Sequence, residues 1–263
     1  LDPRRVKKKH KPKPNFLIIG AAKAGTSSLG FLLGAHPEAG IVLGGQPNFF
    51  SFDDKYKLGW KKYLRLFEHC VGKEAVGDCS RSYSRIRYHP QVVSRIHEHI
   101  PRARIIYMVR HPLDRMVAAY VERMNHPNPP SFASINDAVR KEPMIIDSSR
   151  YWEVFDAYRQ TFGESRIKVL WYEEYVANPT QVFREVCRFL QIDDEIPPDL
   201  SHPRAEPGAD AEESKAPISS SGIQLVTGWD DETRGWVLEQ IRDDNTRFLQ
   251  HFSKPLDFWG TLF

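Results

Sequence analysis

Residues 16–33, FLIIGAAKAGTSSLGFLL, indicate the fold class of this chain. The segment begins with four consecutive apolar residues, which is typical of a short strand buried on both faces. Small residues and the single cation Lys23 then lie between Gly20 and Gly25, and a helical pattern follows. When a strand, a glycine-bounded turn and a helix follow one another in this order, the free N–H groups at the N-terminus of the helix point into the turn. We therefore predict an anion-binding loop at residues 20–28.

Three later segments repeat this alternation of apolar run and helix. The strand candidates are residues 75–78, 105–109 and 167–171, and the helical patterns that follow them are 90–100, 112–124 and 179–190. Strands that are apolar on both sides and separated by helices form a parallel sheet covered on both faces. The predicted fold class is α/β, a single domain with a doubly wound, mainly parallel sheet and a P-loop-like turn.

The carboxyl ends of the strands are the expected ligand-binding edge of such a sheet. Residues 20–28, 78–83 and 110–114 follow three of the predicted strands, and we expect them to converge there. A final amphipathic helix is predicted at residues 230–252. Residues 201–222 are rich in Pro, Ser, Gly and acidic residues and are predicted to form a long loop.

The charge of the chain is unevenly distributed. The formal net charge is +3, but residues 1–13 hold seven Lys or Arg and one Asp, so the rest of the chain is slightly acidic. We predict a flexible basic tail at residues 1–14 and one domain at residues 15–263. An acidic body weighs against a nucleic-acid partner, because nucleic-acid binding depends on neutralising many phosphates. The tail is interpreted as a solvated leader, the alternatives being a membrane-surface or polyanion contact.

Two features of the sequence set the expected compartment. It has no apolar run of about 18 residues, the length that a membrane-spanning helix needs. The cysteines Cys70, Cys79 and Cys187 lack the spacing of a zinc site or a disulfide framework. We expect a cytoplasmic protein without a bound metal. The alternative is the lumenal catalytic domain of a Golgi enzyme whose membrane anchor lies upstream, and the oligomeric state stays open.

The position of Lys23 distinguishes the predicted loop from that of ATP- and GTP-binding proteins. Those proteins have a lysine directly after the second glycine, where this chain has Thr26. A small-molecule kinase is therefore a less favoured function for this chain.

The loop and several later segments together resemble the PAPS-dependent sulfotransferases, where PAPS is 3′-phosphoadenosine-5′-phosphosulfate. IGAAKAGTSS at residues 19–28 is similar to the 5′-phosphosulfate loop of that family, and VRHPLDR at 109–115 is similar to its 3′-phosphate motif. Further similar segments are HP at 36–37, PNFF at 47–50, Tyr56, Gly59-Trp60 and GDCSRSY at 77–83. The resemblance covers about residues 15–262 and is greatest to the heparan-sulfate and bacterial carbohydrate sulfotransferase group.

This resemblance implies an enzyme that transfers a sulfuryl group from PAPS to a hydroxyl of a carbohydrate or small-metabolite acceptor by in-line displacement. The spent nucleotide is adenosine 3′,5′-bisphosphate (PAP), and no metal is required. Lys23 is implied to stabilise the charge on the leaving phosphate oxygen, and Arg110 to bind the 3′-phosphate. The other implied donor-binding residues are Ala22, Ala24, Gly25, Thr26, Ser27, Ser28, Ala118 and Lys215.

The chain departs from the family pattern at three places. Gln46 stands where the heparan-sulfate group has the glutamate that takes the acceptor proton, and an amide is not a base at neutral pH. Cys79 and Arg81 stand in place of a lysine and a proline. Ala118 stands in place of a serine that bonds the 3′-phosphate.

The departures also change the charge expected around the acceptor. Lysine is absent at Gly45 and at Cys79, which predicts an acceptor less anionic than a sulfated glycosaminoglycan. Three arginines could restore the missing charge: Arg81, Arg85 and Arg87.

Three accounts of Gln46 stay open. It is an engineered exchange that traps a complex, or the base has moved to another residue, or the chain binds PAPS and PAP without efficient turnover. For a moved base the candidates are Asp78, His36 and His111, and we favour Asp78 because its segment faces the acceptor cleft in the family. The predicted catalytic residues are therefore Lys23, Gln46 and Asp78.

Overall fold

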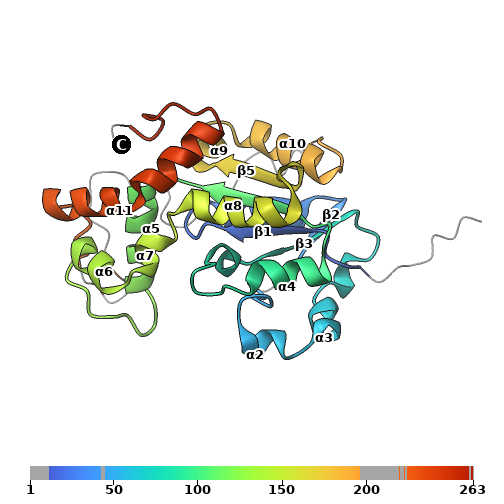
Figure 1. Ribbon diagram of the computed structural model, residues 1–263. Coiled ribbons are helices and arrows are strands. Elements are labelled where there is room, and N and C mark those ends of the chain that lie inside the picture. The colour runs from blue at the N-terminus through green and yellow to red at the C-terminus, as the bar shows by residue number, and fades with distance from the viewer. Residues whose placement is uncertain are drawn as a thin grey trace, which may run out of the picture.

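The fold is a parallel β-sheet with helices on both faces (Figure 1). The computed structural model describes residues 12–42, 45–195, 219, 222, 224–260 and 262. Within these residues five strands pair in the order β2-β3-β1-β4-β5, and every neighbouring pair is parallel. The strands are β1 Phe16–Gly20, β2 Ala39–Ile41, β3 Ala75–Cys79, β4 Arg104–Val109 and β5 Ile167–Trp171. The predicted α/β class and its mainly parallel sheet are confirmed.

The central strands are buried on both faces, which is why they read as continuous apolar runs. Every residue of β1 is buried, and in β4 only the first residue, Arg104, is partly exposed. A strand between two others, with helices above and below, has no polar face. The short strand β2 was not among the predicted strands, because AGI at residues 39–41 is too short and too small in side-chain size to stand out.

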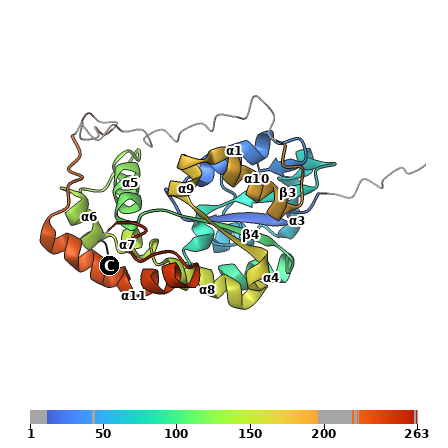
Figure 2. The same cartoon turned by 90° about the horizontal axis from the view of Figure 1, so that it is seen from above.

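Helices follow the strands as the crossover connections of a doubly wound sheet. α1, α9 and α10 lie on one face, and α4 and α8 lie on the other (Figure 2). The helices are α1 Thr26–Ala35, α2 Asp53–Tyr56, α3 Trp60–Arg65, α4 Val92–His99, α5 Pro112–Met124, α6 Ile135–Lys141, α7 Met144–Asp147, α8 Tyr151–Phe162, α9 Tyr172–Ala177, α10 Pro179–Leu190 and α11 Asp231–His251. Short 3-10 turns are η1 Glu68–Cys70, η2 Arg81–Ser84 and η3 Glu164–Arg166.

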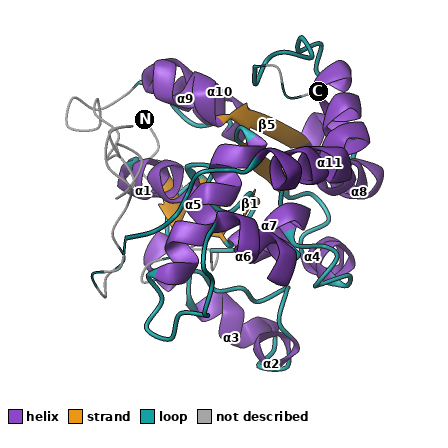
Figure 3. Cartoon of the chain, turned by 90° about the vertical axis from the view of Figure 1, so that its left-hand side faces the viewer, coloured by secondary structure: helices purple, strands orange, loops and turns teal. Residues whose placement is uncertain are grey.

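A group of helices stands at the end of the sheet where β4 runs into α5. α5, α6, α7 and α11 contact one another there and are seen together in Figure 3, which faces that end of the molecule. The sequence predicted α5 and α11 but not α6 or α7, whose segments are short and lack a long apolar period. These helices place side chains across the carboxyl edge of the sheet, where a ligand is expected.

Two of the sequence-based predictions concern residues outside the described part of the chain. These are most of the basic tail at residues 1–14 and most of the loop at residues 201–222. Among the described residues, the helices are all too short or too polar to cross a bilayer.

Candidate active site

The loop after β1 forms a tight turn whose shape depends on glycine. Gly20 has a φ of 138°, and a Cβ atom added there would lie 2.3 Å from the hydroxyl oxygen of Ser84. Gly25 has a φ of 86°, and a Cβ atom there would lie 3.1 Å from the ring of Tyr172. Glycine adopts such backbone angles without strain and leaves the space free. The loop is therefore held closely between η2 on one side and α9 on the other.

Lys23 lies in the middle of this loop, with a φ of 69°. Its neighbours Ala22 and Ala24 are buried, whereas its own side chain is 20% exposed. The N–H group of Ala21 donates to the carbonyl of Met108 on β4 at 2.6 Å, which fixes the loop to the adjacent strand. The first N–H groups of α1 have no carbonyl partner within the helix, so they and the helix dipole favour an anion at this loop.

Arg110 extends from the end of β4 to the same loop. Its Nη1 donates to the carbonyl oxygen of Lys23 at 3.3 Å. Its guanidinium carbon lies 4.4 Å from the ring centre of Tyr172, a cation–π contact. The hydroxyl of Tyr151 donates to the backbone carbonyl of Arg110 at 2.6 Å, which fixes the strand end. The two cations predicted to hold the donor thus meet at one edge of the sheet.

The other predicted donor-binding residues lie at the start of α1 and on α5. Thr26 is buried, Ser27 is exposed, and Ser28 shares a 2.9 Å hydrogen bond with the hydroxyl of Tyr175 on α9. Ala118 is half-buried on α5. Lys215 lies outside the described residues. Their contact with a donor stays a prediction.

A cavity of about 270 Å³ lies beside the loop. Ala22 of the loop contributes to its wall, together with side chains of η2, α5 and α7. The charged residues that line it are Arg81, Arg85, Arg115, Arg123, Glu122, Glu142 and His126. Arginines outnumber carboxylates in this set, so the cavity suits a ligand with negative or strongly polar groups.

Two of these arginines are held without a carboxylate partner among the described residues. Arg115 is 1% exposed, and its guanidinium donates to the hydroxyl of Ser149 at 2.6 Å and to the carbonyl of Ile145. The Nε of Arg85 is buried and has no hydrogen-bond partner in the described part of the chain. Burial lowers the pKa of both groups. A buried donor without a partner is unfavourable, so Arg85 is suited to bind an acceptor group.

Glu122 on α5 links the cavity to the loop. Its Oε1 lies 2.6 Å from Nη1 of Arg81 and 3.9 Å from Nζ of Lys23. Arg115, Ala119 and Glu122 share a face of α5, since they are spaced four and three residues apart. The helical spacing of Arg115, Ala119 and Glu122, which begins within the predicted 3′-phosphate motif, could have identified Glu122 from the sequence. The sequence-based prediction did not include Glu122.

Asp78 lies under the site at the end of β3 and is fully buried. Its carboxylate accepts hydrogen bonds from the hydroxyls of Tyr63 at 2.9 Å, Ser80 at 2.7 Å and Tyr83 at 2.6 Å. Burial raises its pKa to about 6, although the three hydroxyls act to lower it. The group is thus surrounded by its own donors rather than open to the cavity. Its role as base stays a prediction that this environment does not favour.

Gln46 connects its loop to η2. Its Oε1 accepts from the backbone N–H of Arg81 at 3.0 Å. The same loop is fixed to η2 again by Asn48, whose N–H donates to Ser80 at 2.9 Å and whose Oδ1 accepts from Ser82 at 2.6 Å. Gln46 therefore positions the segment that carries Arg81 and, through it, Glu122.

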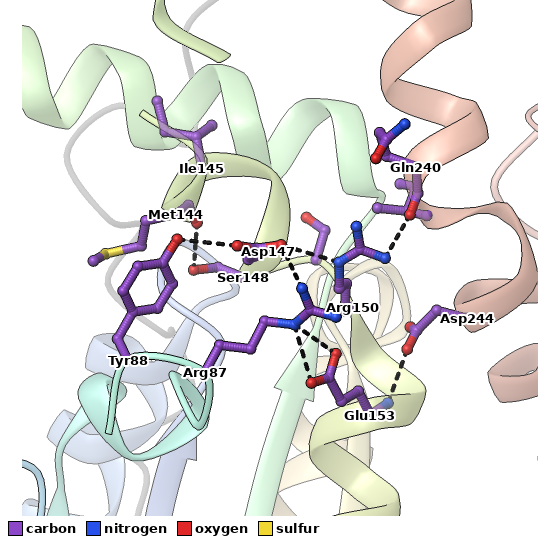
Figure 4. Close-up of polar contacts among 12 residues, drawn as sticks. Arg87, Tyr88, Met144, Ile145, Asp147, Ser148, Arg150, Glu153, Gln240 and Asp244 are labelled. Carbon is purple, nitrogen blue, oxygen red and sulfur yellow. Dashed lines mark hydrogen bonds and ion pairs between the residues drawn. The ribbon is translucent and has the colours of Figure 1, made fainter. Parts of the chain in front are cut away.

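Arg87 lies outside the cavity (Figure 4). Its Nε donates to the two carboxylate oxygens of Glu153 at 3.0 and 2.8 Å, and its Nη1 lies 3.5 Å from Asp147. Asp147 also accepts from Tyr88 and Arg150, each at 3.0 Å. Of the three arginines expected to restore charge, Arg81 and Arg85 line the cavity and Arg87 joins this separate network.

The two histidines considered as bases lie at opposite edges of the sheet. His36 is buried at the end of α1, beside the start of β2 and therefore at the opposite edge of the sheet from the loop. His111 follows Arg110, and its Nδ1 accepts from the N–H of Asp114 at the start of α5 at 3.2 Å. Among the described residues, no group of three or more His, Cys, Asp or Glu side chains could hold a metal ion.

The chain is similar to known sulfotransferases. Its residues 67–195 match the family model described as "Sulfotransferase family". It is 32% identical over 123 residues to human heparan sulfate glucosamine 3-O-sulfotransferase 6, which covers 46% of this chain and 34% of that protein. The chain thus matches about a third of the length of this relative.

Solved structures give the same result over nearly the whole chain. A sulfotransferase from Alicyclobacillus acidocaldarius superposes with a TM-score of 0.74 at 26% identity, covering 94% of this chain and 99% of that one. A mouse sulfotransferase complexed with PAP superposes with a TM-score of 0.57 at 17% identity, covering 92% of this chain and 89% of the mouse chain. The second likeness concerns the fold alone.

Proposed function

Because the chain is similar to sulfotransferases in its family-model match and over nearly the whole of its fold, we propose that it belongs to that family and transfers a sulfuryl group from PAPS to a hydroxyl of a carbohydrate or small-metabolite acceptor. The observation that carries the proposal is the meeting of Lys23 and Arg110 at the carboxyl edge of the sheet. PAPS has an anionic group on each side of its ribose, so it needs two cationic groups on one surface. The mouse sulfotransferase that shares this fold is complexed with PAP, the spent form of the proposed donor.

The donor is proposed to lie along the loop. The N–H groups of residues 24–28 and the ammonium of Lys23 bind the 5′-phosphosulfate, and Arg110 binds the 3′-phosphate as a planar donor pair. Ala118 offers no hydrogen bond, so the 3′-phosphate relies on Arg110 more heavily. Lys215 is proposed as a further donor ligand from a segment outside the described residues.

The reaction is proposed as an in-line displacement at sulfur. The acceptor oxygen forms a bond to sulfur while the bond from sulfur to the bridging phosphate oxygen breaks, and that oxygen keeps the electron pair in PAP. Lys23 stabilises the negative charge on the leaving oxygen, and such preorganised charge is commonly the largest catalytic contribution. The acceptor proton must pass to a base.

The acceptor is proposed to bind in the cavity next to Ala22. Arg85 and Arg115 are the arginines there without a carboxylate partner among the described residues, so they favour an acceptor with a carboxylate or sulfate group. This charge weighs against the less anionic acceptor that the missing lysines at Gly45 and Cys79 predicted. Carbohydrates with uronic acids are therefore the first acceptors to test.

Calorimetry tests the nucleotide specificity. We expect PAP to bind the protein and the Arg110→Ala variant to bind it more weakly, whereas ADP with magnesium should bind poorly. Arg87→Ala is the control, since Arg87 is paired with the carboxylates of Asp147 and Glu153 and does not line the cavity. Tighter binding of magnesium-ADP than of PAP would contradict the proposal and favour a kinase.

Transfer of ³⁵S from PAPS tests the activity. The acceptor panel contains heparan-sulfate oligosaccharides, p-nitrophenyl glucuronides and neutral p-nitrophenyl glycosides. We expect labelled product with at least one member. No product at high protein concentration, together with tight PAP binding, would favour a member that binds the nucleotide without turnover.

The similar proteins described above are sulfotransferases, which gives no support to the kinase or the non-catalytic alternative. A cytoplasmic location stays a proposal, with the Golgi lumen as the alternative.

A further inference from the structure

We propose that Glu122 on α5 is the general base that takes the acceptor proton, in place of the glutamate that Gln46 lacks. The inference rests on the proposed sulfuryl transfer and adds a catalytic residue to it. Gln46 and Glu122 lie on different elements, yet a continuous line of contacts joins them across the cavity edge.

The line of contacts begins at the donor loop. Nζ of Lys23 lies 3.9 Å from Oε1 of Glu122, and the same oxygen accepts from Nη1 of Arg81 at 2.6 Å. The backbone N–H of Arg81 in turn donates to Oε1 of Gln46 at 3.0 Å. These contacts restrain the Glu122 carboxylate beside Lys23, the residue proposed to stabilise the leaving group.

One oxygen of Glu122 is available for a proton. The contacts of the carboxylate with Lys23 and Arg81 both use Oε1, and the described residues provide no hydrogen bond to Oε2. The side chain is 38% exposed and lines the 270 Å³ cavity, so an acceptor hydroxyl in that cavity can reach Oε2. A base needs this reach before any other property.

The other candidate bases among the described residues are less well placed. Asp78 is fully buried and already accepts three hydroxyl hydrogen bonds. Glu142, the second carboxylate of the cavity, accepts from Nε of Arg123 at 3.0 Å and is not bonded to the donor loop. His126 is exposed one turn beyond Glu122, and its Nδ1 accepts from the N–H of Asn128.

The proton balance of the step is simple. As the acceptor oxygen bonds to sulfur, its O–H bond breaks and the proton passes to Oε2 of Glu122. The bond from sulfur to the phosphate oxygen breaks at the same time, and the electron pair stays on PAP beside Lys23. The neutral carboxyl group then returns its proton to water through its exposed side.

The test compares Glu122→Gln with the wild-type protein in ³⁵S transfer from PAPS to the panel member with the highest wild-type rate. We expect kcat to fall by about 10²- to 10⁴-fold, the usual effect of one general base, with little change in KM for PAPS. Calorimetry with PAP should give an affinity within about threefold of wild type, which shows that the variant is folded and binds its nucleotide.

A matched control is Glu153→Gln. Glu153 is 35% exposed and ion-paired with Arg87 at 2.8 Å (Figure 4), so it resembles Glu122 in exposure and pairing, but it is not among the residues that line the cavity. Its kcat should equal that of the wild type. In addition, formate should restore part of the rate of Glu122→Ala in a concentration-dependent way, because a small carboxylate can occupy the vacated space.

The outcomes separate the two proposals. Wild-type transfer together with an unchanged kcat for Glu122→Gln would overturn the role of Glu122, and a large loss in Asp78→Asn alone would assign the base to Asp78. A fall in PAP affinity that accounts for the whole loss would also overturn it, since Glu122 would then act only on the charge of Lys23. Absence of any wild-type transfer would overturn the proposed function, and the base with it.

Discussion

Replacement of Asp78 by Asn should remove a pH-dependent cost to the stability of the fold. The carboxyl group is fully buried among Tyr63, Ser80 and Tyr83, and burial raises its pKa from 3.8 to about 6. The folded protein therefore binds this proton more tightly than the unfolded chain does. Stability from this group is present below the unfolded pKa and is lost as the pH rises through the folded pKa.

The size of the effect follows from the pKa difference. A shift from 3.8 to about 6 corresponds to about 3 kcal/mol when the pH is above both values. Between pH 4 and pH 7 the wild-type protein should lose about 2 kcal/mol relative to Asp78→Asn, since part of the loss occurs below pH 4. The amide keeps the shape of the side chain and carries no charge, so the variant lacks this loss.

Urea denaturation of both proteins at several pH values between 4 and 7 measures the difference directly. Asp244, a second buried carboxyl group whose pKa burial raises to about 6, is present in both proteins and cancels. The control is Asp54→Asn, an exposed aspartate whose variant should follow the wild type at every pH. If the free energies of unfolding of Asp78→Asn and the wild type changed in parallel with pH, the prediction would be wrong, because Asp78 would then ionise equally easily in the folded and the unfolded protein.

Three further predictions concern the loop and its surroundings. Arg110→Ala should weaken PAP binding about 10- to 100-fold in calorimetry, since hydrogen bonds to charged groups contribute about 1.5–3 kcal/mol; an unchanged affinity would place the 3′-phosphate elsewhere. Gly25→Ala should lower the free energy of unfolding, measured by urea denaturation, by about 1–2 kcal/mol, because a φ of 86° strains alanine and a Cβ atom would lie 3.1 Å from the ring of Tyr172. A variant as stable as the wild type would mean that the loop relaxes without cost. Arg87→Ala should cost less than about 1 kcal/mol, as surface ion pairs do, and should leave transfer unchanged; a loss of kcat would extend the site to the network in Figure 4.

The sequence was sufficient for four of the five described strands and for the turn that follows β1, because both depend on local patterns. The buried strands β1 and β4 have no polar face, so their apolar runs were visible without knowledge of the tertiary structure. The loop contains two glycines at positions where the backbone requires them, and Arg110 directly follows a buried strand. Such features lie within a few residues of one another.

The acceptor side could be predicted less well, because it forms from segments far apart in the chain. Glu122 contacts Arg81, which is 41 residues earlier, and Arg81 contacts Gln46, which is 35 residues before that. No local pattern marks a pairing of this kind. Asp78 was favoured as a base because its segment faces the acceptor cleft in the family that the chain resembles, but that resemblance did not indicate that Tyr63 and Tyr83 close over it.

Tyr172 has a consequence for how the protein loses activity. This one ring packs against Gly25 and against the guanidinium of Arg110, and it directly follows β5, which among the described strands pairs only with β4. Edge strands open more readily than central ones because fewer neighbours restrain them. Local fraying of β5 would therefore loosen both parts of the proposed nucleotide site at once while the rest of the sheet stays folded, so inactivation by heat should come before global unfolding.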